Sequence, residues 1–167
     1  MWFWKRDPKE VQVSAPTLPT VPTLPADVET QILLNVPISD LGRYCLRDKL
    51  AESICQSNYF WSLRLSKDFP GAKVEDGDAR ESYIKIYRSY LANLRLLRRL
   101  VLDDAPPELV KTVFDKWWNP MNPAGVVKSA VRDPALSRYR VSWQQLVYRY
   151  ALEKNITGAE AAAELAH

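Results

Sequence analysis

Residues 24–70 contain short apolar repeats that are interrupted by proline and polar turn residues, and this pattern allows short helices but no long bundle. In the first repeat, Val28, Ile32 and Val36 recur at every fourth position until Pro37 ends the pattern. The helices expected in this segment, with their N-caps, are 27–36, one beginning at Asp40 (N-cap Ser39), 50–56 and 59–68 (N-cap Ser57 or Asn58). The segment is therefore predicted to form an orthogonal cluster of short helices.

The first of these helices is apolar on two sides. At about 100° per residue, Leu33 widens the stripe of Val28 and Ile32, whereas Leu34 points to the opposite side. One side should face the cluster's own core, and the other should face either a partner protein or the C-terminal half of the chain. Exposure of Leu34 and of the Leu24–Pro25 entry would favour a partner surface, whereas their burial under the C-terminal half would favour an autonomous structural unit.

Residues 78–102 show the longest helical pattern in the chain. Their apolar residues alternate spacings of four and three and so line one face: Tyr83, Tyr87, Tyr90, Leu94, Leu97 and Val101. Four basic residues fall within about 80° of one another on the other side: Lys85, Arg88, Arg95 and Arg99. This basic stripe is open to three interpretations, namely a solvated outer face, a contact for an acidic partner, and a contact for a phosphate backbone. The net charge of +3 is modest for a nucleic-acid-binding protein, so nucleic acid is the least favoured of these partners.

The remaining residues, 103–167, also follow helical patterns. Apolar residues repeat at helical spacing over 108–118 and, more weakly, over 124–132. Two capping boxes, Ser142–Gln145 and Thr157–Glu160, each open a further helix. No strand pattern is longer than 138–143, so the predicted fold class is all-α: the helical cluster, then the long amphipathic helix, then a C-terminal helical segment. The predicted parts are a proline-rich arm or linker (1–23), the short-helix module (24–70), the long basic helix (71–102) and a C-terminal helical region (103–167).

Three tryptophans in the C-terminal region are candidate anchors for a bound protein. Trp117 and Trp143 lie on the apolar stripes of their helices, which favours a role in the core. Trp118 lies off the stripe and is more open to a binding role. Trp117 and Trp118 are therefore the candidate target-binding residues, with core packing the favoured role for Trp117.

The first 23 residues read as an arm. Proline stands at every third position over 19–25, which matches polyproline II and forbids helix. Trp2, Phe3 and Trp4 at its start are unusual for a spacer, because exposed aromatic rings are costly unless something covers them. They could dock on the chain's own body or on a partner.

The sequence lacks the residues that most enzyme sites require. Its single histidine is the terminal His167, and no glycine-rich phosphate loop is present. Cys45 and Cys55 have no metal-site spacing and are expected to be reduced thiols in the core. We therefore expect a non-enzymatic protein with no cofactor and no metal. No run of about eighteen apolar residues is present, and the opening is too short for a signal peptide, so we expect no membrane span and a cytoplasmic or nuclear location rather than secretion.

An ordered set of residues in the 24–70 module resembles the F-box family. The set consists of Leu24-Pro25, Asp27, Ile32-Leu33, Asp40-Leu41 and the late cluster Tyr59-Phe60-Trp61. The segment from Phe60-Trp61 through Leu65 to Asp68-Phe69-Pro70 is most similar to the F-box-type proteins of large DNA viruses, whose location would be the host cell.

This resemblance implies a protein-interaction adaptor. F-box modules dock a Skp-type subunit of a cullin–RING ubiquitin ligase, and the rest of the chain then presents a target protein. Carried over by position, the docking residues would be Leu24, Pro25, Ile32, Leu33, Leu34, Leu41, Ile54, Tyr59, Phe60 and Trp61. Truncation of Leu33 would then cost roughly 2 kcal/mol or more of binding free energy.

The chain departs from the family pattern in two respects. Arg47-Asp48-Lys49 places three charges where the family is usually more apolar, and no repeat domain follows, so the target would have to bind residues 103–167. One alternative is a structural or assembly subunit, viral in character, that uses the helical module for packing. A lesser alternative is nucleic-acid binding through the basic stripe, which would weaken steeply with salt.

Overall fold

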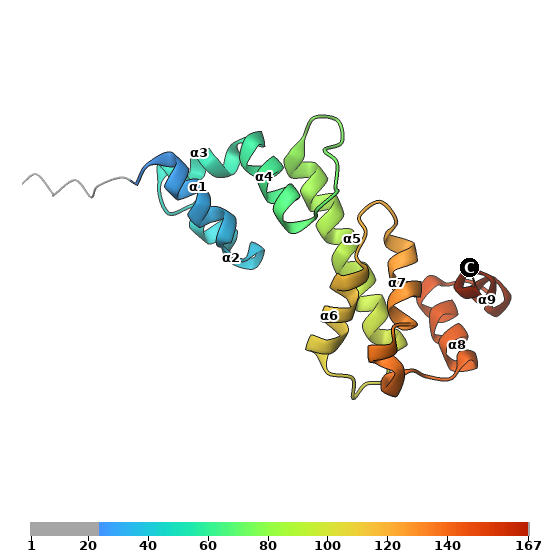
Figure 1. Ribbon diagram of the computed structural model, residues 1–167. Coiled ribbons are helices and arrows are strands. Elements are labelled where there is room, and N and C mark those ends of the chain that lie inside the picture. The colour runs from blue at the N-terminus through green and yellow to red at the C-terminus, as the bar shows by residue number, and fades with distance from the viewer. Residues whose placement is uncertain (1–23, 167) are drawn as a thin grey trace, which may run out of the picture.

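The computed structural model describes residues 24–166, which form nine α-helices and one 3₁₀ helix (Figure 1). The helices are α1 (Ala26–Asn35), α2 (Ile38–Cys45), α3 (Lys49–Gln56), α4 (Asn58–Asp68), α5 (Ala79–Leu100), α6 (Pro107–Trp117), α7 (Pro123–Val131), the 3₁₀ helix η1 (Pro134–Tyr139), α8 (Trp143–Lys154) and α9 (Gly158–Ala166). Over the described residues the only extended pairing is one isolated bridge between Val101 and Arg140, so the all-α class is confirmed. None of these helices combines the length and the apolarity needed to cross a membrane. The predicted arm, its aromatic residues and His167 lie outside the described range.

Helices α1 to α4 form a cluster around their own core. Leu33, Phe60 and Leu65 are almost completely buried there. The side chain of Ser57 accepts a hydrogen bond from the Phe60 backbone N–H (3.1 Å), which confirms it as the N-cap of α4. The predicted cap at Ser39 is wrong, because α2 already begins at Ile38, directly after Pro37.

The long helix α5 belongs to two cores. Its first turns bury Ala79 and Tyr83 against α1–α4, whereas its later turns bury Leu94, Leu97 and Leu100 against α6–α9. In Figure 1 this helix leads from the N-terminal cluster to the C-terminal helices. The pattern over 78–102 therefore predicted the helix correctly, but the structure shows that its buried face is divided between two neighbours.

The C-terminal helices α6–α9 surround the second half of α5. Both predicted capping boxes lie at helix starts: Ser142 accepts from the Gln145 N–H (3.3 Å), and Thr157 and Glu160 exchange hydrogen bonds in both directions. These caps satisfy N–H groups that a helix start otherwise leaves without partners. Local sequence therefore fixes where α8 and α9 begin.

An aromatic seam joins the two cores. Tyr90 and Trp118 each pack against both clusters of buried residues. Phe69, at the end of α4, lies 5.9 Å from Tyr90 and 6.2 Å from Trp118 between ring centroids. Such tilted aromatic pairs contribute beyond their buried area. The α1–α4 cluster is thus anchored to the rest of the chain through this seam as well as through α5.

The two cysteines form a disulfide, which corrects the prediction of reduced thiols. Cys45, at the end of α2, is bonded to Cys55, in α3, and their Cα atoms are 5.8 Å apart. The prediction was wrong because cysteine number and cellular compartment carry no information on distance. The packing of α2 against α3 brings the two thiols together.

We expect loss of this disulfide to destabilise the α1–α4 cluster. A Cys45→Ala, Cys55→Ala variant should lose about 2–3 kcal/mol of unfolding free energy in oxidising buffer, because the cross-link closes a loop in the unfolded chain. Urea unfolding with and without a dithiol reductant measures this loss. The reductant should destabilise the wild type but not the variant, and an equal response of both proteins would contradict a role for the bond.

Candidate functional site

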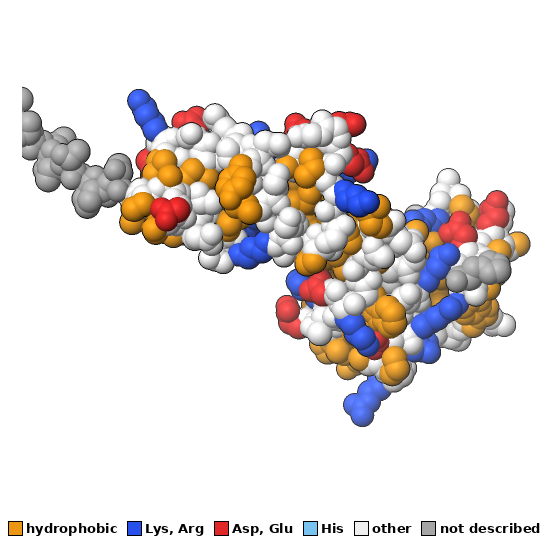
Figure 2. Space-filling view, turned by 45° about the horizontal axis from the view of Figure 1, so that its top comes forward, with side chains coloured by type: hydrophobic (Ala, Val, Ile, Leu, Met, Phe, Trp, Pro, Cys, Tyr) orange, Lys and Arg blue, Asp and Glu red, His pale blue; other side chains and the backbone are white. Residues whose placement is uncertain are grey.

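An exposed apolar strip runs along α1. It consists of Leu24, Val28 and Ile32, which are 46%, 41% and 37% exposed and lie four residues apart. We call these residues the α1 strip. Figure 2 shows hydrophobic side chains gathered on the surface of the N-terminal helices, near the point where the grey trace joins them. Apolar side chains grouped in this way on a rigid helix are typical of a protein-contact surface.

The opposite side of α1 is buried in the cluster. Leu33 is 0% and Leu34 7% exposed. The sequence did not indicate which side of this helix faces the core; Leu33 and Leu34, both predicted docking residues, lie in it, and the side with Val28 and Ile32 stays open. Exposure of Leu34 and of Leu24–Pro25 was expected to distinguish a partner surface from an autonomous structural unit. Leu24 and Pro25 are exposed, which favours a partner surface. Leu34 is covered, but by the N-terminal cluster and not by the C-terminal half, so it favours neither.

Arg64 and Lys67 of α4 both bond the C-terminal end of α1. Arg64 Nη1 donates to the carbonyls of Leu33 (3.2 Å), Leu34 (3.1 Å) and Val36 (2.8 Å), at the C-terminal end of α1. Carbonyls at a helix end have no partner within the helix, and a cation there is favoured by the helix dipole. No basic residue lies in the last turn of α1 itself, so α4 supplies the charge.

The Arg64 guanidinium is in turn held by an acidic partner. Its Nε donates to Asp68 Oδ2 (2.6 Å), and the Tyr83 hydroxyl donates to the same oxygen (2.8 Å). Burial raises the pKa of Tyr83 far above its usual value, and the hydrogen bond to Asp68 adds to the shift. This network links α1, α4 and α5 through buried polar groups.

The charged stretch that departs from the family pattern also has a structural role. Arg47 Nη2 donates to Glu29 (2.6 Å), a carboxylate of α1 that is 1% exposed, and Arg47 Nε donates to Asp48 (2.9 Å). The Ala51 backbone N–H and the Arg47 guanidinium lower the pKa of Asp48, which is the N-cap of α3. These charges hold α1 against the start of α3.

The ten predicted docking residues differ in their exposure. Four are exposed, and Ile54 is half-buried; the exposed residues are Leu24, Pro25, Ile32 and Tyr59. The other five are buried: Leu33, Leu34, Leu41, Phe60 and Trp61. The expectation that these five side chains form the surface is therefore corrected, because they fill the core beneath it. The Trp61 indole, for example, donates to the Cys55 carbonyl (2.7 Å).

The basic stripe on α5 is exposed over its whole length. Lys85 pairs with Glu75 (2.5 Å) and Arg99 with Glu153 (2.5 Å). Within residues 24–166, no salt bridge includes Arg88 or Arg95. Because two of its four charges are neutralised, the stripe fits a solvated outer face better than a phosphate-binding track.

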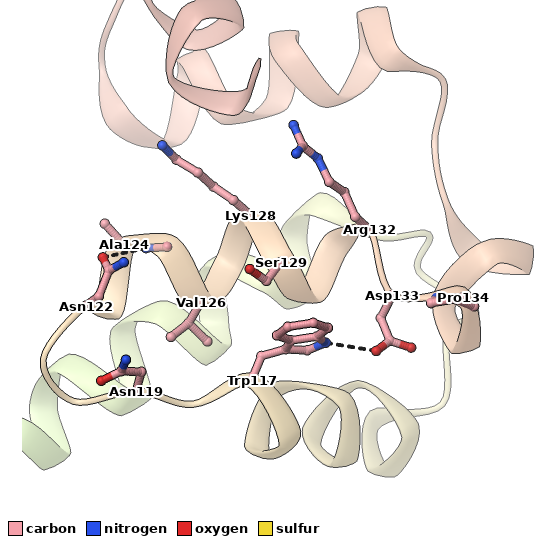
Figure 3. A pocket seen from close by; sticks show the side chains of 11 residues that line it. Trp117, Asn119, Asn122, Ala124, Val126, Lys128, Ser129, Arg132, Asp133 and Pro134 are labelled. Carbon is pink, nitrogen blue, oxygen red and sulfur yellow. Dashed lines mark hydrogen bonds between the residues drawn. The ribbon is translucent and has the colours of Figure 1, made fainter. Parts of the chain in front are cut away.

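Trp117 lines a cavity between α6 and α7 (Figure 3). The cavity has a volume of about 720 Å³, and we call it the Trp117 cavity. The Trp117 side chain is 40% exposed, and its indole N–H donates to Asp133 Oδ2 (2.8 Å). Its predicted role in the core was therefore wrong.

Asp133 is the buried acid at the edge of this cavity. Lys116 donates to the same Oδ2 (2.7 Å), and the Ala135 backbone N–H donates to Oδ1 (2.9 Å). Lys116, then the Ala135 N–H, then Trp117 lower the pKa of Asp133 to about 2. Asp133 is thus a fully partnered carboxylate that fixes the position of the Trp117 ring.

Trp118 has the role that had been expected of Trp117. It is half-buried in the aromatic seam, 5.1 Å from Tyr90 between ring centroids, and its indole nitrogen has no hydrogen-bond partner among the described residues. The reversal has a local cause. Helix α6 ends at Trp117, and Trp118 takes an extended backbone conformation (φ −57°, ψ 126°). The helical period therefore does not give the direction of its side chain.

A second exposed apolar face, which was not predicted from the sequence, lies on α8. Tyr148 and Leu152 are 65% and 63% exposed, and Trp143 at the start of the helix is 49% exposed, which corrects its predicted core role. The spacing of Tyr148 and Leu152 by four residues is the signal that could have revealed this face. It is a second surface that a bound protein could contact.

The F-box resemblance rests on the order of residues within 24–70. No family model matches this chain, and comparisons with curated proteins and with solved structures likewise find no match. The resemblance therefore stays a prediction, to be judged on the surfaces described above.

Proposed function

We propose that this chain is an F-box-like interaction adaptor whose N-terminal cluster docks a Skp-type subunit of a cullin–RING ubiquitin ligase. The observation that carries the proposal is the exposed α1 strip above a complete core. Leu24, Val28 and Ile32 remain open although the cluster has already buried Leu33 and Leu34. A helix that leaves an apolar face uncovered after its own core is filled can bury that face on a partner.

The position of the strip supports this role. It begins at the Leu24–Pro25 entry, which is part of the ordered set that resembles the F-box. Helix α1 is held rigidly by Arg64 at its C-terminal end and by Arg47 through Glu29. A surface on a fixed helix loses little conformational entropy on binding, which favours affinity.

The C-terminal helices are proposed to hold the target. Their exposed apolar residues, Tyr148 and Leu152 on α8, lie outside the N-terminal cluster and belong to a different core. Two exposed apolar surfaces on separate parts of one chain suit a protein that joins two partners. The proposed adaptor is non-enzymatic and acts in the cytoplasm or nucleus, although the Cys45–Cys55 disulfide is of a kind that is rare in those compartments.

Co-elution with a purified Skp-type protein in size-exclusion chromatography tests the docking step. The wild type should form a stable complex, and a Val28→Glu, Ile32→Glu variant should not. A central hot-spot anchor contributes about 2 kcal/mol or more, so loss of one such residue should weaken binding about 30-fold. Leu33→Glu is unsuitable for this test, because it would place a charge in the core and unfold the cluster.

The matched control is Tyr148→Glu, Leu152→Glu, which introduces the same charges on the exposed face of α8. This variant should keep the complex with the Skp-type protein. If the folded wild type forms no complex, or if both variants lose it equally, the docking proposal is wrong. The structural or assembly subunit would then become the favoured function, with the α1 strip and the α8 face as packing surfaces.

A further inference from the structure

The Trp117 cavity has an aromatic wall in a fixed position. The Trp117 indole N–H is bonded to Asp133, and the Lys116 ammonium lies 5.3 Å from the centre of the Trp117 ring. Because Asp133 is 4% exposed and partnered on both oxygens, it holds the ring without offering a free negative charge to the cavity. Because Lys116 lies over one face of this ordered ring, a flat ligand group would have to stack on the other face.

Two cations of α7 line the same cavity across from Trp117. Lys128 and Arg132 lie four residues apart, and in Figure 3 the ends of both side chains point away from the Trp117 ring. Across residues 24–166, neither side chain takes part in a salt bridge. The single hydrogen bond of the Arg132 guanidinium within this range goes from Nη2 to the Leu165 carbonyl. The cavity therefore presents positive charge that the described part of the chain does not neutralise.

The other polar groups around the cavity are also mainly donors. The side-chain oxygen of Asn122 accepts from the Gly125 N–H (3.1 Å), and that of Asn119 accepts from the Met121 N–H (2.9 Å). Both amide groups keep N–H donors for a ligand, and the Ser129 hydroxyl points from α7 toward the Trp117 side (Figure 3). A ligand that matches this lining must be anionic and rich in acceptors.

From these features we infer that the Trp117 cavity binds a nucleoside phosphate, either as a free nucleotide or as one unit of a single strand. The base would stack on Trp117, and the phosphate would bind Lys128 and Arg132. Proteins bind nucleotides through stacking of the base on an aromatic side chain and through charge-assisted hydrogen bonds to the phosphate. This inference is independent of the adaptor proposal, and it uses a different site from the basic stripe on α5.

Isothermal titration of the full chain tests the inference with four probes: adenosine monophosphate, adenosine, inorganic phosphate and a short single-stranded DNA. Adenosine monophosphate should bind more than tenfold more tightly than either adenosine or inorganic phosphate. A Lys128→Ala, Arg132→Ala variant should weaken this binding at least tenfold. A Trp117→Leu variant should also weaken it and should remove the quenching of tryptophan fluorescence by the nucleotide.

The matched control is Arg88→Ala, Arg95→Ala, which removes from α5 two exposed charges that form no salt bridge within residues 24–166 and should leave binding unchanged. Binding of the single strand more than tenfold tighter than that of the monophosphate identifies the strand as the ligand, and equal binding identifies the free nucleotide. The inference is overturned if neither binds, if inorganic phosphate binds as tightly as the monophosphate, or if the α7 variant, folded by circular dichroism, binds like the wild type.

Discussion

An Arg64→Ala variant is expected to lose about 3–5 kcal/mol of unfolding free energy, because it removes one partner from a buried charged network. Arg64 is 4% exposed and donates to three carbonyls at the end of α1 as well as to Asp68. Without it, the Val36 carbonyl loses its side-chain donor in a buried setting, whereas Lys67 still donates to the Leu34 carbonyl (2.7 Å) and Tyr83 still donates to Asp68 (2.8 Å). Urea unfolding followed by far-ultraviolet circular dichroism measures the loss.

Two further variants sharpen this result. Arg64→Lys keeps the charge, but an ammonium lacks the planar guanidinium that bonds several acceptors at once. Its loss of unfolding free energy should therefore lie between zero and the loss of Arg64→Ala. Arg88→Ala removes an exposed arginine that has no salt bridge among the described residues and should change stability by less than about 0.5 kcal/mol. A loss below about 1 kcal/mol for Arg64→Ala would show that water replaces the guanidinium, and that α1 does not depend on α4 for its C-terminal cap.

A Phe114→Ala variant is expected to lose about 3–5 kcal/mol of unfolding free energy, because the substitution leaves a cavity in a tightly packed core. Phe114 is 0% exposed, and its ring lies 5.2 Å from that of Tyr90 and 5.4 Å from that of Trp118. Tyr90 and Trp118 also contact the N-terminal core, so the loss should weaken the junction between the two cores. Urea unfolding gives the free energy, and hydrogen exchange shows which helices lose protection.

Trp143→Ala is the matched control for this variant. It removes a larger aromatic ring that is 49% exposed, so its effect should be much smaller than that of Phe114→Ala. Faster hydrogen exchange in α4 as well as in α6 of Phe114→Ala would show that the aromatic seam couples the two cores. Faster exchange confined to α6–α9 would show that the N-terminal cluster is stable without the seam.

Local sequence predicted most of the helices. The helical period and the capping residues gave α3, α4 and α5 within about two residues, because a cap satisfies N–H groups of its own helix and needs no distant partner. The Thr157–Glu160 capping box predicted the start of α9 in the same way. Ser39 failed as a cap because Pro37, whose φ is already fixed, allowed α2 to begin earlier.

The candidate surfaces were less predictable. The α1 strip contains Leu24 and Ile32 from the predicted docking set, but the pattern could not show that Leu33 and Leu34 face inward. A helix that is apolar on two sides fits a core in either orientation, so the choice falls to groups elsewhere in the chain. Here Arg64 and Lys67 bond the end of α1 from 28 to 33 residues away in sequence.

The sequence by itself determined the all-α class, the short helices and the caps, because these depend on contacts within a few residues. Only the tertiary structure decided the Cys45–Cys55 disulfide, the open face of α1 and the exchange of roles between Trp117 and Trp118. Each of these depends on how separate helices meet or on where a helix ends. Hydrophobic burial is non-directional, so the apolar pattern shows that a side chain can be buried but does not show against what.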